Sequence, residues 1–179
     1  SKRQIYLPAN PRVYPLSLGQ KRFHSFEQAG HFTSACSTDF YRDDWLFPLD
    51  NVEHVFVCEP VHNLVQHLLV REEGVSFSAS RAERDGEPEF LASEDQWFRP
   101  VMARTGPDGA LWIVYMYRYM IEHPDWLPPE GRKELEPFYR QGESHSRIYR
   151  VVPKERTHAV QRLRATPLDR LSPVELVAT

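Results

Sequence analysis

The sequence lacks several features that mark common protein classes. No apolar run in its 179 residues approaches the roughly 18 residues that a membrane-spanning helix needs. The formal net charge is −3, which gives no indication of a nucleic-acid or anionic-membrane partner. No P-loop, GxGxxG, GxSxG or HExxH motif occurs, so the usual signatures of nucleotide binding, serine hydrolysis and zinc-dependent proteolysis are absent.

Cysteine is also scarce, with two residues, Cys36 and Cys58. They form no CxxC pair, and no CxxCH haem-attachment motif occurs. Both cysteines lie in strand-like runs. Two alternatives stay open, a disulfide across neighbouring strands or two buried thiols, because free cysteine is among the most buried residue types. A secreted protein would favour the disulfide.

Aromatic residues and proline, by contrast, are abundant. Aromatics make up 12% of the chain, and there are 15 prolines. Many aromatics with many turn formers favour short strands joined by loops over a helical bundle. The hydrophobic content of 41% is enough for an ordinary core, and the length suits one domain. The composition therefore predicts an all-β fold.

The chain up to residue 94 is predicted to hold one β-rich unit. Residues 1–30 are irregular, basic and interrupted by proline, which is typical of a loop or the tail of a preceding unit. Strands are predicted at 31–36, 54–58, 62–70 and 75–79. The third of these also has apolar residues at helical spacing, so a helical turn stays an alternative there.

A second unit is predicted to follow, from residue 95 to residue 153. Its strands are predicted at 98–104, 110–117 and 147–152. Gly106-Pro107-Asp108-Gly109 is a tight-turn signal between the first two, because proline presets φ and glycine permits a positive φ. Three further prolines mark a long loop, in which a helical turn is predicted at 131–135.

The end of the sequence has the pattern of a helix start. Ser172 suits the N-cap, Pro173 the first helical position and Glu175 the third. The chain stops at Thr179, soon after this helix begins. We therefore expect residues 154–179 to be a linker and the start of a helical region, and the chain to be a fragment of a longer protein.

The two units resemble weak repeats of one another. Phe32 corresponds to Phe98, and residues 55–62 can be aligned with residues 111–118. The offsets of about 66 and about 56 residues give each unit the size of a four-stranded propeller blade with long loops.

Several segments together resemble one family more specifically. They are His31–Cys36, Tyr41–Asp44, Phe56–Val65, Glu89–Ser93, Trp97–Val101, Gly106–Leu111, Ile121–Trp126 and Arg147–Pro153. These segments are similar in sequence to the corresponding segments of the PVC-type membrane-bound dehydrogenase-like proteins. Their β-propeller resembles that of soluble quinoprotein glucose and sorbosone dehydrogenases. The resemblance covers roughly Phe23 to Pro153.

The resemblance implies how the chain is organised. Residues 1–30 would be the tail of a preceding blade, 31–94 and 95–153 would be two blades, and 154–179 would lead into a helical region. The remaining blades and a c-type cytochrome domain would lie outside this chain, so any haem would be there as well. Such proteins are expected to be exported to the periplasm or secreted, and some are associated with the membrane. An oxidising compartment would suit Cys36 and Cys58.

One position departs from the family pattern. After the Gly-Pro-Asp-Gly turn the pattern runs to Asp-Met-Tyr-Arg, but here Tyr115 stands in place of the aspartate before Met116. A carboxylate that bound a metal or a substrate hydroxyl at this position would be lost. Glu59 occupies the equivalent place in the first unit and keeps its acid.

The candidate site residues are those expected where inner strands meet near a propeller axis. They are Glu59, His62 and Asn63 in the first unit and Arg99, Tyr117 and Arg118 in the second. Oxidation of a sugar or alcohol needs a base for the hydroxyl proton, and His62 suits that role near neutral pH. A quinone cofactor such as PQQ carries three carboxylates, which arginines would hold; calcium could accompany it.

Each candidate also has a structural interpretation. His62 could pair with Glu59 or with a backbone carbonyl, and His31 and His54 at strand starts suit structural roles. Salt bridges could join Arg99 and Arg118 to Asp43, Asp44, Asp95 or Glu122. Trp97 and Trp112 could stack on a sugar, although propeller cores use large aromatics anyway. A metal site made of His31, His62 and a carboxylate matches no compact motif.

The sequence thus predicts part of an exported, dehydrogenase-like propeller. It would oxidise a sugar or alcohol with a quinone-type cofactor and pass electrons to a haem domain elsewhere, and the chain alone would be inactive. The alternative is a non-catalytic propeller that binds carbohydrate or another protein, which Tyr115 favours. Fold alone cannot decide between them, because propellers host many functions.

Overall fold

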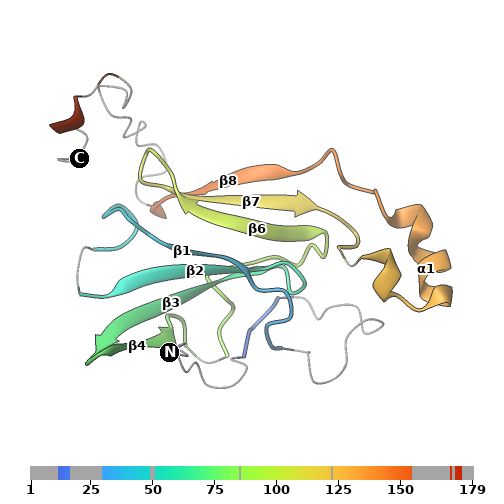
Figure 1. Cartoon of the computed structure of the whole chain (residues 1–179), viewed down its shortest axis with the longest axis horizontal. Coiled ribbons are helices and arrows are strands. Elements are labelled where there is room, and N and C mark those ends of the chain that lie inside the picture. Colours follow the sequence, from blue (N-terminus) through green and yellow to red (C-terminus); the bar gives the residue numbers. More distant parts are fainter. Residues whose placement is uncertain are drawn as a thin grey trace.

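The computed structural model describes residues 12–16, 30–48, 51–84, 86–121, 123–154, 170 and 172–174. They form two antiparallel β-sheets and a short helical excursion (Figure 1). The first sheet has the strand order β1-β2-β3-β4, with β5 paired to β3. Its strands are β1 (Cys36–Phe40), β2 (Glu53–Glu59), β3 (Leu64–Glu73), β4 (Ser76–Arg81) and β5 (Leu91–Ala92).

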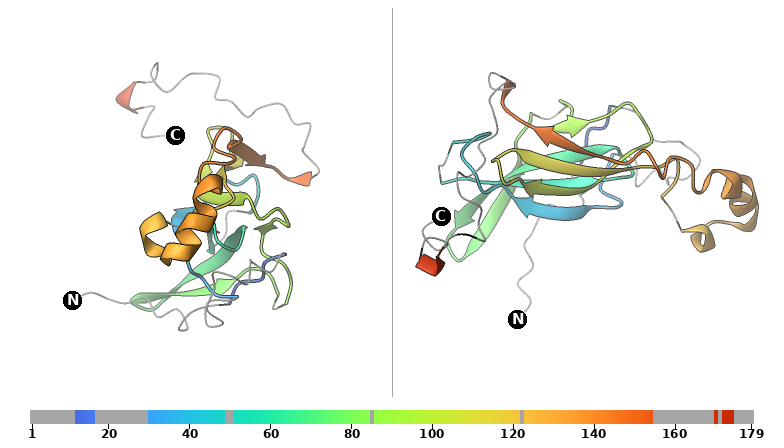
Figure 2. Two further views of the ribbon diagram at one scale, coloured as in Figure 1. Left: turned by 90° about the vertical axis from the view of Figure 1, so that its right-hand side faces the viewer. Right: turned by 90° about the horizontal axis from the view of Figure 1, so that it is seen from above.

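The second sheet is a three-stranded meander, β6-β7-β8. Its strands are β6 (Phe98–Thr105), β7 (Leu111–Tyr117) and β8 (Arg147–Val151). Between β7 and β8 the chain leaves the sheet and forms η1 (Pro124–Trp126), α1 (Pro129–Leu135) and η2 (Glu136–Phe138). Seen from above, α1 lies beyond the end of both sheets (Figure 2). No described helix is long and apolar enough to cross a membrane.

β7 is the central strand of the second sheet, and the burial of its side chains alternates. Leu111, Ile113 and Tyr115 are buried, whereas the intervening side chains are half-buried. This period of two places one apolar row on the face that packs against the first sheet. In β2, by contrast, every residue from Val55 to Glu59 is buried, because both faces of the first sheet are covered at that strand.

The hydrophobic core lies between the two sheets. It contains side chains from both sheets and from the loop after β1, namely Tyr41, Phe56, Cys58, Val65, Ala103, Leu111 and Ile113. β6 of the second sheet lies against β1 and β2 of the first. Hydrogen bonds support this contact, since the Ala103 amide donates to Ser37 Oγ at 3.1 Å and Tyr41 Oη donates to the Gly109 carbonyl at 2.5 Å.

The all-β prediction is confirmed, and most predicted strands exist. The strand alternative for residues 62–70 is correct, because β3 begins at Leu64 and the helical alternative does not occur there. The tight turn at 106–109 is present, with Gly109 at φ +81°. The predicted helical turn at 131–135 lies within α1.

The first predicted strand is wrong. Residues 31–35 belong to no named strand, and β1 starts at Cys36, where the prediction ended. The backbone N–H groups of Thr33 and Ser34 donate to the Glu59 carboxylate instead of to a strand ladder. The proposed correspondence of Phe32 with Phe98 is therefore not between two strand positions, since Phe98 begins β6.

Two predictions fall partly outside the described residues. Of the loop predicted at 1–30, the structure describes 12–16 and residue 30, and Arg12 pairs with His31 in an isolated antiparallel bridge. At the predicted helix start, Pro173 and Val174 are helical, and the residues after Val174 lie outside the described part.

Candidate functional site

Glu59 is the centre of the candidate site in the first sheet. It ends β2 and its side chain is fully buried. Its carboxylate accepts hydrogen bonds from the backbone N–H groups of Thr33 and Ser34 at 3.0 Å each, and from the Ser34 hydroxyl at 2.8 Å. The Thr33 hydroxyl and the Val61 amide add two longer bonds. The loop before β1 thus folds around this carboxylate.

These donors decide the charge state of Glu59. Burial by itself raises the pKa of a carboxyl group, because it disfavours the charged form. The neighbouring His62 and the hydrogen bonds from Ser34 and Thr33 together outweigh burial and lower the pKa of Glu59 below its ordinary value. Glu59 is therefore an ionised carboxylate at neutral pH, fixed in one orientation.

His62 lies beside this carboxylate in the turn between β2 and β3. Its Nδ1 is 3.5 Å from Glu59 Oε1, and 5% of the residue is exposed. The Glu59 carboxylate thus lies beside the His62 imidazole at ion-pair distance. The structure thus brings two of the three candidates of the first unit, Glu59 and His62, together. The structural interpretation of His62 predicted that it pairs with Glu59, so the same proximity also fits that interpretation.

Asn63 connects the same turn to the second sheet. It adopts φ +58°, in the left-handed region that asparagine tolerates better than most residues. Its buried Nδ2 donates to the carbonyls of Gln96 at 3.1 Å and Phe98 at 2.5 Å. The Ser93 amide donates to the Asn63 carbonyl at 3.0 Å. Asn63 therefore fixes the start of β6 against the β2–β3 turn.

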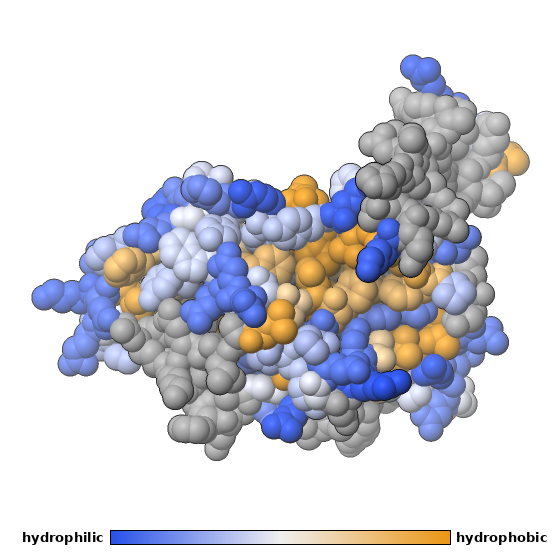
Figure 3. Space-filling model, turned by 180° about the vertical axis from the view of Figure 1, so that it is seen from behind, coloured by the Kyte–Doolittle hydropathy of each residue, from blue (hydrophilic) through white to orange (hydrophobic). Residues whose placement is uncertain are grey.

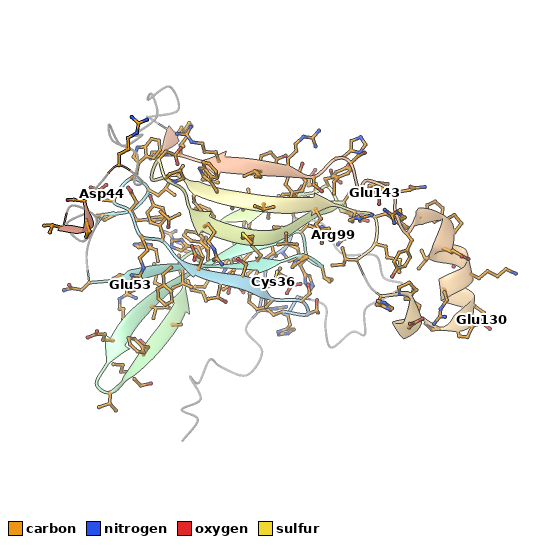
Figure 4. All side chains as sticks on the ribbon, turned by 45° about the horizontal axis from the view of Figure 1, so that its top comes forward. Cys36, Asp44, Glu53, Arg99, Glu130 and Glu143 are labelled. Carbon is orange, nitrogen blue, oxygen red and sulfur yellow. The ribbon has the colours of Figure 1, made fainter. Side chains whose placement is uncertain are left out.

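Arg99 joins the β2–β3 turn to the end of β7. Its guanidinium donates to four main-chain carbonyls at 3.0–3.3 Å, those of Pro60, Val61, Arg118 and Tyr119. Figure 4 labels Arg99 near the end of the second sheet from which the helical excursion leaves. These bonds occupy four of the five donors that a guanidinium has. The side chain is a clamp between two turns.

Tyr117 and Arg118 lie beside Arg99, in a row of aromatic rings at the end of β7. Ring contacts connect His145, Tyr117, Trp97, Tyr119 and Phe138, with centroid separations of 5.4–6.0 Å. Burial, followed by the charge of Asp95, raises the pKa of Tyr117. Arg118 pairs with Glu143 at 3.5 Å, which is not one of the acidic residues suggested by the sequence. Glu122, one of those, lies outside the described residues.

Tyr115 is buried in the second sheet. It stands where the family that the sequence resembles has an aspartate. Its ring stacks on Tyr149 at 5.0 Å, and the two hydroxyls are 3.4 Å apart. Arg147 donates to the Tyr115 hydroxyl at 3.1 Å. This position therefore holds a packed phenol with an arginine beside it, and it offers no carboxylate to a metal or to a sugar hydroxyl.

The other aromatic and histidine candidates also have identifiable contacts. Trp112 Nε1 donates to Asp108 Oδ1 at 3.1 Å, and Asp108 also accepts from the Ala110 amide in the tight turn. His54 Nδ1 and His67 Nε2 are 2.8 Å apart across the β2–β3 pair. Phe47 stacks on His54 with centroids 4.1 Å apart. The stacking of Phe47 on His54 holds the loop after β1 against the first sheet.

Cys36 and Cys58 are directly opposite one another in the β1–β2 ladder. Both are free thiols in the structure. Cys58 is fully buried, and Cys36 is half-buried with Sγ 3.6 Å from the Val101 carbonyl. Burial and the neighbouring Cys36 raise the pKa of Cys58 to about 12.

A second buried polar cluster was missed by the sequence analysis. Glu89 is buried and accepts from the Tyr14 amide at 3.1 Å, from Gln66 Nε2 at 3.4 Å and from Arg81 Nε at 3.0 Å. The cluster attaches residues 12–16 to the first sheet. A possible signal was Gln66, a polar residue within an apolar strand, because a buried amide in that position needs a partner.

The described residues do not assemble a recognisable metal or cofactor site. No group of three or more His, Cys, Asp or Glu side chains suited to a metal ion is found among them. Arg99 gives its donors to main-chain carbonyls, so it does not fit a bidentate clamp for a PQQ carboxylate. What the site does contain is an oriented carboxylate–histidine pair beside an aromatic row.

Comparison with known proteins gives one family. The family described as a domain of unknown function (DUF7133) matches residues 1–155. No curated protein and no solved structure matches the chain.

Proposed function

The chain belongs to the DUF7133 family, a domain of unknown function, and we propose that it forms two neighbouring blades of a β-propeller. The complete protein would be an exported, dehydrogenase-like enzyme that oxidises a sugar or an alcohol. In this proposal the present chain contributes a base and the rim of the site. The quinone cofactor, calcium and the haem domain belong to the rest of the protein.

The arrangement of the sheets supports the blade interpretation. The path β1-β2-β3-β4 of the first sheet is an antiparallel meander with the four strands of a blade, to which the short β5 is added beside β3; the second sheet is a three-stranded meander, β6-β7-β8. The sheets meet at β6, which lies against β1 and β2. Neighbouring blades pack face to face in this way around a propeller axis.

The observation that carries the catalytic part is the Glu59–His62 pair. Removal of hydride from a carbinol carbon requires that the hydroxyl proton go to a base. His62 lies with Nδ1 3.5 Å from the Glu59 carboxylate, which hydrogen bonds keep ionised. Nε2 is then the atom that would take the proton, and the negative charge of Glu59 would stabilise the imidazolium that results.

The test uses the complete protein reconstituted with PQQ and calcium. Oxidation of aldoses and primary alcohols is followed by reduction of a dye acceptor, and PQQ binding is measured by calorimetry. His62→Ala is expected to lower kcat by about 10²–10⁴-fold while PQQ binding is kept. Glu59→Gln should lower kcat less. His123→Ala is the matched control, because His123 is an exposed histidine near Asp125, and its kcat should be unchanged.

Two outcomes of this experiment would contradict different parts of the proposal. A folded complete protein that neither binds PQQ nor oxidises any of these substrates would contradict the dehydrogenase proposal. Oxidation that persists in a folded His62→Ala variant would keep the enzyme class but remove His62 as the base.

A second function, a non-catalytic propeller that binds carbohydrate or protein, is favoured by a different observation. The donors of Arg99 go to main-chain carbonyls, and Tyr115 replaces a carboxylate with a packed phenol. Because these two side chains make contacts that stabilise the fold, they are less able to bind a cofactor or a substrate. The complete gene discriminates between the two functions, because a downstream CxxCH and an upstream catalytic histidine would support redox chemistry, and their absence would support a binding module.

A further inference from the structure

The pairing of β1 with β2 places the two cysteines of the chain opposite each other. Cys36 and Cys58 are Cα partners in this antiparallel ladder. Directly opposed residues have Cα atoms about 4.5–5.5 Å apart and project to the same face. Disulfide-bonded cysteines have Cα separations of about 4.4–6.8 Å. Residues paired in this way therefore fall within the range of Cα separations that a disulfide requires.

The side chains share one environment as well. Cys58 belongs to the core between the sheets, and Cys36 packs against that core. Figure 4 labels Cys36 on β1 in the middle of the molecule, where the two sheets meet.

We propose that Cys36 and Cys58 form a cross-strand disulfide when the protein folds under oxidising conditions, and that the two free thiols are its reduced form. The proposal does not depend on the dehydrogenase function. It concerns a covalent modification of the first sheet, with a small-molecule or protein disulfide as the oxidant.

The reaction is an ordinary thiol–disulfide exchange in two steps. The Cys36 thiolate attacks the oxidant's disulfide, forms a mixed disulfide and releases one thiolate. The Cys58 thiolate then attacks the Cys36 sulfur, the Cys36–Cys58 bond forms, and the second thiolate leaves. The two thiol protons end on the released thiolates, and the two electrons lost by the pair reduce the oxidant. Cys36 reacts first because it is half-buried, whereas Cys58 is fully buried.

The bond would fix the edge strand that carries the contact between the sheets. A bulge lies between Cys36 and Asp39, and Ser37 within it adopts φ +51°. Ser37 Oγ accepts from the Ala103 amide of the second sheet, and Arg104 pairs with Asp39 at 2.8 Å. Tying Cys36 to β2 restricts this irregular segment, and closing the loop to Cys58 reduces the freedom of the unfolded chain.

The experiment is refolding of the reduced chain in a buffer of oxidised and reduced glutathione, followed by acid quenching. The intact mass should fall by two hydrogen atoms, and no thiol should react with an alkylating agent after unfolding. Trypsin separates the cysteines at Arg42, so the peptides that contain them should remain linked until a reductant is added. The melting temperature should rise on the order of 5 °C relative to the reduced chain.

Cys36→Ser is the matched control, because it removes the half-buried cysteine and leaves the core residue Cys58 in place. It should keep its full mass, apart from a glutathione adduct, and its melting temperature should not respond to a reductant. The proposal is overturned if the folded wild-type chain still has two titratable thiols after this treatment. It is equally overturned if the oxidised product is a disulfide-linked dimer, visible on a non-reducing gel.

Discussion

Glu59 shows how one buried carboxylate organises residues that are distant in sequence. It is fully buried, yet Thr33, Ser34 and Val61 surround it with donors. A buried charge is tolerated when its desolvation is offset by hydrogen bonds to the charged form. The β2–β3 turn and the loop before β1 therefore depend on the ionised state of a single side chain.

The acid sensitivity of the fold should reflect this residue. The pKa of Glu59 is lower in the folded protein than its ordinary value of 4.5. A lowered pKa contributes stability that is complete above the unfolded value and is lost as the pH falls through the folded value. Urea unfolding from about pH 7 to about pH 3 should show part of the wild-type stability disappearing below pH 4.5.

Glu59→Gln tests the assignment. It should cost about 2–4 kcal/mol of unfolding free energy at neutral pH, because charge-assisted bonds are lost and a buried amide faces backbone donors. The stability lost in acid should then be smaller in the variant than in the wild type. An equal acid dependence of both proteins would show that other carboxylates are responsible.

At the scale of elements, the predicted strands agree with the structure where the local sequence pattern determines the position of the strand. β2, β6 and β7 lie within a residue of their predicted bounds, because runs such as Leu111–Tyr117 combine β-branched and aromatic residues between clear turn signals. The strand predicted at 31–36 has the same local character. There a contact with Glu59, far away in sequence, takes the backbone donors, and no local pattern could reveal it.

The candidate site was predictable to the same extent. Glu59, His62 and Asn63 are close in sequence, so their placement at one turn followed from the end of β2. The partners of Arg99 could not be inferred, because four carbonyls in two turns acquire their positions only from the packing of one sheet on the other. The opposition of Cys36 and Cys58 similarly required the register of β1 and β2.

The helical excursion between β7 and β8 depends on a glycine whose replacement should be severe. Gly142 has φ +87°, and a Cβ there would overlap the carbonyl oxygen of Tyr117. Gly142→Ala should therefore cost roughly 2–4 kcal/mol of unfolding free energy, since a strained φ and a clash with backbone add together. Chemical denaturation of the folded chain measures this cost.

Gly131→Ala is the matched control within the same excursion. Gly131 lies in α1, its φ is not positive, and the nearest atom to an added Cβ is 3.9 Å away. The substitution should stabilise the chain by about 0.5–1 kcal/mol, because alanine loses less backbone entropy in a helix. Equal effects of the two substitutions would contradict the role given to Gly142.

At the scale of the whole molecule, the two sheets differ in how they are covered. The first sheet is covered at β2 on both faces, by the second sheet and by the segments that contact Glu59 and Glu89. The second sheet buries the row of Leu111, Ile113 and Tyr115 toward the first. On its other face Met102, Val114 and Ile148 are partners in register across β6, β7 and β8.

This apolar row is open in the described structure. Met102 is 42% exposed and Ile148 is 60% exposed. Seen from behind, the molecule has a broad apolar area near the centre of its surface, with polar side chains around it (Figure 3). An apolar face of a sheet with no cover is an association site, because burial of such surface is the main favourable term in binding.

The chain alone should therefore self-associate through the second sheet. In sedimentation experiments the average mass should rise with protein concentration, and Met102→Lys combined with Ile148→Lys should keep the chain monomeric, because two charges would be buried without partners. Val75→Lys is the control, since Val75 is 84% exposed at the β3–β4 turn, and it should associate as the wild type does. A wild-type chain that stays monomeric, or a double variant that associates equally, would mean that this face needs no partner.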